Sequence, residues 1–97
     1  MKHTNAITRS ARGEECLVRV GGYCNHNPET VVYAHKNGGG MGTKGHKTQG
    51  AYACSDCHDC VDGRQKTHYS AEMMKVMFYE GIFRTQLVLI EKGLIKA

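Results

Sequence analysis

Two cysteines, Cys54 and Cys57, form a CxxC motif near the middle of this 97-residue chain. The motif opens a predicted helix, whose first turn brings both sulfurs to one point and whose exposed backbone N–H groups favour thiolate. Two thiolates placed in this way can chelate a metal ion. A tetrahedral zinc needs two further ligands, and Cys16 and Cys24 are the donors that we expect to supply them.

The fifth cysteine, Cys60, extends the motif to Cys54-x2-Cys57-x2-Cys60. This run resembles an iron–sulfur ligand pattern but lacks its fourth cysteine and its proline. We interpret Cys60 as an apolar residue outside a structural four-cysteine zinc site. Inert buried thiols and redox or iron–sulfur chemistry are the alternative interpretations of the same residues.

A histidine and a carboxylate follow the CxxC motif at helical spacing. His58 and Asp62 are separated by four residues, so a helix presents both on one face, where they can offer two ligands to a divalent cation. A solvent-exposed histidine–aspartate contact would have the same spacing. His35 ends a predicted strand, a position at which a histidine is usually only a polar strand end.

The basic residues favour a phosphate-bearing partner. The formal net charge is +4, and no acidic residue lies between Glu29 and Asp56, a segment that contains three lysines. A local basic surface of this kind suits phosphate. Lys44, in a glycine-rich loop, and Arg64, just after the predicted helix, are the candidate phosphate contacts. Lysines that merely solvate a loop would give the same pattern.

Three extended segments are predicted before the CxxC motif. Residues 16–20 alternate, and together with a Gly21–Gly22 turn and the return through Cys24 they predict a β-hairpin with cysteines at its neck. Residues 30–34 form a second strand that ends at His35. After the glycine-rich loop, residues 51–53 are expected to pair back on that strand.

Helical patterns account for the rest of the chain. A short N-terminal arm is expected to turn once into a helix before Gly13. The CxxC helix should run from a cap at Ser55 or Asp56 to Gly63, and a long C-terminal helix from Ser70 to Lys92. The apolar run 87–90 exceeds one helix face, which predicts a homodimer through this helix.

Size and composition limit the fold to one α+β domain over residues 1–97. A hydrophobic fraction of 40% without tryptophan predicts a thin core that a bound metal would support. No apolar run is long enough for a membrane span or a signal peptide. We therefore expect no membrane association and a cytoplasmic location, where thiols bind metal rather than pair.

The order of these features resembles the HNH, or ββα-metal, nuclease finger. Ala34-His35 carries the resemblance in the first segment, and Cys54-Ser-Asp-Cys57-His58 carries it at the helix start. More closely, the chain resembles the YbcO-like family of short prophage-encoded nucleases. The segments that carry this likeness span nearly the whole chain: ARGEECLVRV, CNHNPETVVYAH, GGGMGTKG, AYACSDCHDCVDGR and GLIKA.

The resemblance implies roles for individual residues. His35 matches the general base of the finger, His58 matches the first metal ligand on the helix, and Asp62 matches the second, where many such fingers have histidine. Two positions depart from the pattern. Ala34 stands where a metal ligand is often found, and no asparagine lies between Lys47 and Ala53 to match the middle residue of the motif.

The expected fold is therefore a small zinc-stabilised, treble-clef-like ββα-metal finger with a long C-terminal helix. The expected function is metal-dependent hydrolysis of DNA phosphodiester bonds by an HNH-type endonuclease. Its cofactors would be a structural zinc and a catalytic divalent ion such as Mg²⁺ or Mn²⁺. The alternative is a noncatalytic zinc module that binds nucleic acid or a protein partner, which the two departures favour.

Overall fold

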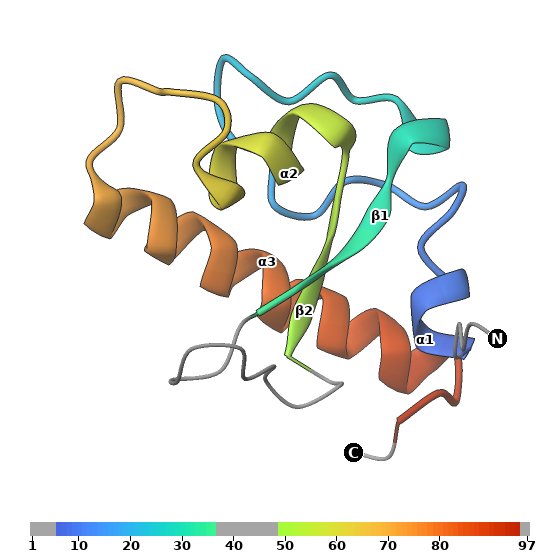
Figure 1. The fold of residues 1–97 in the computed structure, drawn as a ribbon. Coiled ribbons are helices and arrows are strands. Elements are labelled where there is room, and N and C mark those ends of the chain that lie inside the picture. Colours follow the sequence, from blue (N-terminus) through green and yellow to red (C-terminus); the bar gives the residue numbers. More distant parts are fainter. Residues whose placement is uncertain (1–5, 37–48, 96–97) are drawn as a thin grey trace, which may run out of the picture.

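The computed structural model describes residues 6–36 and 49–95. These residues form a small α+β fold whose elements follow in the order α1 (Ala6–Arg9), a 3-10 turn (Pro28–Thr30), β1 (Val32–His35), β2 (Gly50–Ala53), α2 (Ser55–Asp62) and α3 (Ala71–Glu91) (Figure 1). Among the described helices, none combines the length and the apolar character that crossing a bilayer requires.

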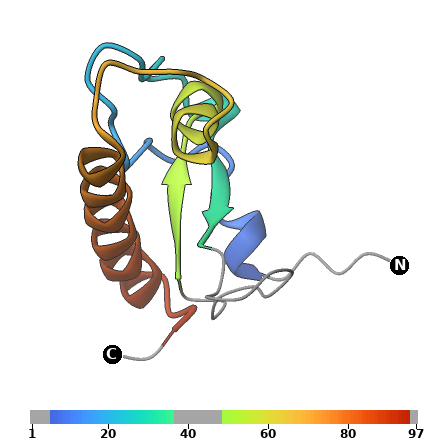
Figure 2. The same cartoon turned by 60° about the vertical axis from the view of Figure 1, so that its left-hand side comes forward.

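The predicted pairing of the two middle strands is confirmed. β1 and β2 are antiparallel, with Tyr33 opposite Tyr52 and His35 opposite Gly50. Gly50 has no tolerable replacement there, because a Cβ atom would lie 2.6 Å from the Tyr33 ring. α3 packs along β2 and α1 lies next to β1, so the two strands lie between these helices (Figure 2).

The predicted hairpin at residues 16–24 is wrong, because this segment contains no strand. Its residues do not alternate in burial, since Leu17 and Val18 are both buried, and Arg19 has a φ of 57°, which interrupts an extended chain. The segment ends in a tight turn in which the Val20 carbonyl accepts hydrogen bonds from the N–H groups of Tyr23 and Cys24. It is a buried loop that brings Cys16 and Cys24 together.

The end of α2 and the start of α3 lie where the sequence predicts them. Gly63 ends α2 with a φ of 83°, a left-handed conformation that suits glycine, and Ser70 caps α3 by accepting a hydrogen bond from Met73 N–H. The predicted cap of α2 at Ser55 or Asp56 is wrong by one residue. Cys54 is the cap, because its sulfur accepts the Cys57 N–H.

α3 is held to β2 through a buried threonine. The Thr85 hydroxyl is fully buried, donates to the Gly81 carbonyl at 2.7 Å and accepts the Tyr52 N–H at 3.0 Å. The Tyr52 carbonyl accepts the N–H of Leu17. The outer edge of β2 is therefore closed by a loop and a helix, and the sheet needs no third strand.

Candidate metal centre and the neighbouring histidine hollow

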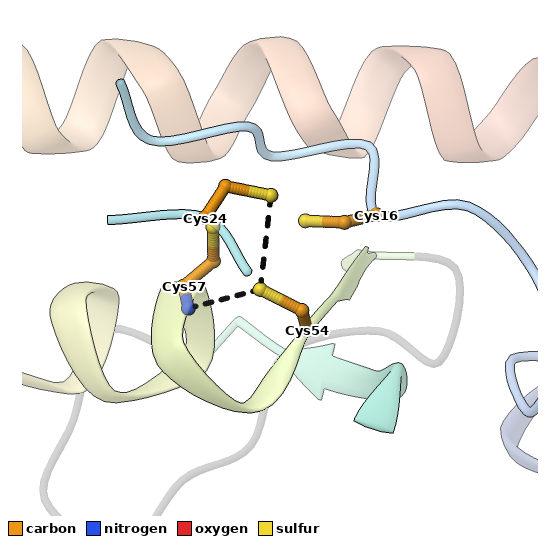
Figure 3. A group of neighbouring side chains, drawn as sticks. All are labelled: Cys16, Cys24, Cys54 and Cys57. Atoms are coloured by element: carbon orange, nitrogen blue, oxygen red, sulfur yellow. Dashed lines mark hydrogen bonds between the residues drawn. The ribbon is translucent and has the colours of Figure 1, made fainter. Parts of the chain in front are cut away.

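Four cysteines meet at the junction of the buried loop and α2. The sulfurs of Cys16, Cys24, Cys54 and Cys57 all lie within 4.8 Å of one another (Figure 3). Cys24 and Cys54 sulfurs are 3.8 Å apart. A tetrahedral zinc with Zn–S bonds of about 2.3 Å separates its sulfurs by about 3.8 Å. The predicted ligand set is therefore brought together, and all five cysteines of the chain are free thiols.

Backbone N–H groups already point at these sulfurs. Cys57 Sγ accepts the N–H of Val20 at 3.3 Å, and Cys54 Sγ accepts those of Asn25 and Cys57 at 3.5 and 3.4 Å. Such donors stabilise the negative charge of thiolates and orient metal ligands. The donor set and its surroundings thus fit a structural zinc, and Cys60, buried on the next turn of α2, is not part of the group.

The thiols perturb one another's pKa values. The Cys57 thiol donates a hydrogen bond to Cys16, which lowers the pKa of Cys16 to about 4. That same hydrogen bond, together with burial, raises the pKa of Cys57, and burial raises the pKa of Cys24 to about 11. One thiolate is therefore stable here, while several buried thiolates need a cation.

The two candidate histidines share one hollow beside α2. His35 at the end of β1 and His58 in the first turn of α2 both line it, although 23 positions separate them. The hollow has a volume of about 580 Å³, and its other lining residues are Val32, Tyr33, Asp62 and Arg64. His58 Nε2 lies 3.3 Å from Asp62 Oδ2, so the predicted common helix face is confirmed.

Arg64 lines the same hollow but is tied to carboxylates. Its guanidinium lies 3.0 Å from Asp59 Oδ1 and 3.2 Å from Asp62 Oδ2. Asp62 thus interacts with His58 and Arg64 through the same oxygen. The candidate phosphate contact is already paired, and its positive charge is largely balanced.

Three expectations concern residues near this hollow. Ala34 is 2% exposed and carries no donor, so β1 offers His35 alone at its end. Lys44, the other candidate phosphate contact, lies outside the described residues. No described residue between Gln49 and Ala53 is an asparagine. Among the residues that the structure describes, the hollow therefore offers one helical histidine–aspartate pair and one strand histidine as candidate metal ligands or proton acceptors.

Tyr33 contacts His35 in the hollow, which was not predicted from the sequence. Its ring packs edge-on against His35, with the ring centroids 5.1 Å apart, and burial raises the pKa of Tyr33 to about 12. The phenol is therefore neutral at physiological pH. The two-residue spacing from His35 was the available signal, because residues i and i+2 of a strand lie on one face.

The chain matches a family model described as "Putative nuclease YbcO" over residues 5–94. Two proteins with that name, from Escherichia coli strain K12 and Enterobacteria phage 82, are each 44% identical to it over 95 residues. These matches cover 94% of this chain and 97% of each relative.

A solved structure has the same fold. It is described as a putative bacteriophage protein from Escherichia coli strain K-12 substrain MG1655, and it is 40% identical to this chain with a TM-score of 0.76. The match covers 89% of this chain and 98% of that one. Sequence and structure agree over nearly the full length, and the chain belongs to the YbcO family of proteins named as nucleases.

Proposed function

We propose that this protein is a metal-dependent HNH-type endonuclease that hydrolyses DNA phosphodiester bonds. The single observation that carries the proposal is the hollow in which His35 meets the His58–Asp62 pair. The order β1, β2, α2, with the CxxC motif at the start of α2, supports the assignment to treble-clef-like ββα-metal fingers. The family name supports a nucleic acid substrate.

In this proposal each residue of the hollow has a distinct role. Neutral His35 accepts the proton of the attacking water, a task for which imidazole is suited near neutral pH. His58 and Asp62 hold a divalent ion such as Mg²⁺ or Mn²⁺. When bound, such an ion stabilises negative charge on the phosphate and the departing 3′ oxygen. Tyr33 holds the His35 ring through the edge contact.

The four-cysteine group supplies rigidity rather than chemistry. A structural zinc would join the buried loop to the start of α2 through Cys16, Cys24, Cys54 and Cys57. Because His58 directly follows Cys57, such a zinc would also orient His58. The free thiols suit a reducing bacterial cytoplasm, where we place the protein.

Plasmid cleavage tests the proposal directly. We expect nicking or linearisation in the presence of Mg²⁺, Mn²⁺ or another divalent ion, and a loss of about 100-fold or more in His35→Ala, the scale of a general base. His68→Ala is the matched control, because His68 stacks on Tyr69, is exposed and does not line the hollow. Zinc content and thermal stability should be unchanged in both variants. A fully active His35→Ala protein would overturn the base assignment.

A second candidate function is a noncatalytic zinc module that binds nucleic acid or protein. Ala34 favours it, because β1 gives no metal ligand there, and so does Arg64, because it neutralises Asp62. This candidate predicts no cleavage with any metal, together with DNA binding that survives substitution of both His35 and His58. Cleavage that depends on either histidine rules it out.

The outer face of α3 supports the predicted homodimer. The side chains of Phe83 and Leu87 are 66% and 64% exposed. Five exposed residues and the half-buried Ile90 follow the alternating three- and four-residue spacing of a helix–helix seam: Met73, Val76, Glu80, Phe83, Leu87 and Ile90. Only one member of this seam is charged.

The apolar character of the seam supports a second copy as the occupant. Phe83 lies at its centre, and apolar residues lie on both sides of it along the helix. Light scattering should find a dimer for the wild-type protein and a monomer for Phe83→Asp. A wild-type monomer at high micromolar concentration contradicts the homodimer.

A further inference from the structure

A second hollow adjoins the histidine hollow along β1. It has a volume of about 520 Å³ and lies between α1 and the strand, lined by Thr8, Arg9, Arg12, Glu29, Val31, Val32 and Tyr33. Val32 and Tyr33 also line the histidine hollow, so the two hollows adjoin at these residues of β1.

The surface between the two hollows suits an extended ligand. Val32 is 43% exposed and carries no charge, so nothing there repels a phosphate chain. A nucleic acid strand that entered the histidine hollow could continue over Val32 into the second hollow. A single small ligand would have no reason to span both.

The second hollow offers positive charge that the first lacks. Arg9 and Arg12 are both exposed, and Arg12 makes no ion pair with any residue that the structure describes. Glu29 is the one acidic lining residue. In the histidine hollow, by contrast, Arg64 is engaged by Asp59 and Asp62. Arg12 therefore offers a phosphate a charge that is not shared with a described carboxylate, whereas Arg64 beside α2 is shared between two.

We propose that Arg9 and Arg12 bind the nucleic acid backbone on one side of the phosphate that enters the hollow of His35, His58 and Asp62. The backbone runs across Val32, and the two guanidinium groups contact phosphates that flank the reacting one. This inference rests on the proposed nuclease function, which places the reacting phosphate in the histidine hollow. It adds a backbone-binding track, made of Arg9 and Arg12, that lies outside the ββα segment. Such contacts set affinity and position rather than sequence preference.

The salt dependence of DNA binding tests this track. The probe is a fluorescent 30-base-pair duplex without divalent metal, and its binding is followed by anisotropy over a series of NaCl concentrations. Each phosphate contact contributes about −0.9 to the slope of log K against log salt concentration. The double variant Arg9→Gln/Arg12→Gln should therefore have a slope shallower by about 2. Affinity at low salt should fall at least tenfold.

A second double variant with the same loss of charge is the control. Arg19→Gln/Lys66→Gln also removes two positive charges, and both residues are exposed and lie outside the two hollows. Its slope should change by much less than that of Arg9→Gln/Arg12→Gln. Circular dichroism and zinc content establish that both variants are folded. Equal slopes for the two variants, or an unchanged slope for Arg9→Gln/Arg12→Gln, would overturn the track.

The failure of this inference is distinguishable from failure of the nuclease proposal. An unchanged slope together with cleavage that depends on His35 removes the track and leaves the nuclease. A shallower slope without cleavage in any metal confirms Arg9 and Arg12 as a nucleic acid site and removes the catalytic assignment. The two measurements are independent, because duplex binding is recorded by anisotropy without divalent metal and plasmid cleavage is recorded with it.

Discussion

The cysteine cluster and the histidine hollow are built on the same short helix, yet they are opposite in character. Cys57 is completely buried, whereas the side chain of the next residue, His58, is 32% exposed. Consecutive helix residues point about 100° apart, so one face of α2 is fixed in the interior and the neighbouring face is open to solvent. In the proposed function, a single helix would thus be anchored by one metal site and would work through another.

The two regions also differ in how their charges are balanced. The cluster receives three backbone N–H···S hydrogen bonds from buried or partly buried groups. The hollow instead relies on side-chain contacts of Asp62 with His58 and Arg64, which solvent and ligands can displace. The first arrangement supports a permanent ion, and the second suits exchange of metal and substrate.

Loss of a cluster ligand should produce the largest effect. Cys57→Ser removes a fully buried ligand, so we expect loss of bound zinc and a largely unfolded protein, because zinc binding and folding are coupled. Cys60→Ala is the matched control on the same helix and should cost about 1 kcal/mol while keeping one zinc per chain. Elemental analysis and thermal melting measure both effects. A folded, zinc-loaded Cys57→Ser protein would show that the ligand set is wrong.

Loss of a ligand in the hollow should affect function and leave the fold intact. Asp62→Asn should lower cleavage at fixed metal concentration by about 10- to 100-fold, the range for a weakened metal site. Asp59→Asn is the control, because Asp59 also pairs with Arg64 but does not line the hollow. Metal titrations of cleavage rate compare the two. Equal losses would assign the effect to Arg64 rather than to metal binding.

Substitution of Gly81 should destabilise the protein while sparing both sites. A Cβ atom there would lie 2.8 Å from a Val18 side-chain carbon and 3.0 Å from the Val18 Cα. We expect Gly81→Ala to lower the free energy of unfolding by about 1–3 kcal/mol, the cost of overpacking. Denaturant titration measures this loss, and zinc content should stay at one per chain. A more stable variant would mean that the loop and α3 can separate without cost.

The smallest effect is expected at the start of α3. Ser70→Ala removes the hydroxyl that accepts the Met73 N–H at 3.1 Å. Loss of a helix N-cap costs about 1 kcal/mol. Thermal melting should detect the decrease, while cleavage and zinc content should not change. A loss as large as that of Gly81→Ala would indicate that this end of the helix supports more than its own backbone.

Local features of the fold were predictable because neighbouring residues encode them. Gly63 marks the end of α2, Ser70 marks the start of α3, and the β-branched and aromatic residues before His35 mark β1. The His58–Asp62 contact follows from helix geometry alone. The loop at residues 16–24 was mistaken for a hairpin because its apolar residues resemble a strand. Their backbone groups are instead taken by Tyr52 and the Cys57 sulfur.

By itself, the sequence determined the chemistry that is present: four thiols that suit zinc, a helical histidine–aspartate pair and a histidine at a strand end. Only the tertiary structure decided what these groups meet. It brought His35 into the hollow of His58, tied Arg64 to Asp62 and placed Arg9 and Arg12 beside the same strand. The physical reason is range, because caps and periodicity depend on residues within a few positions, whereas convergence of distant side chains depends on how the whole chain packs.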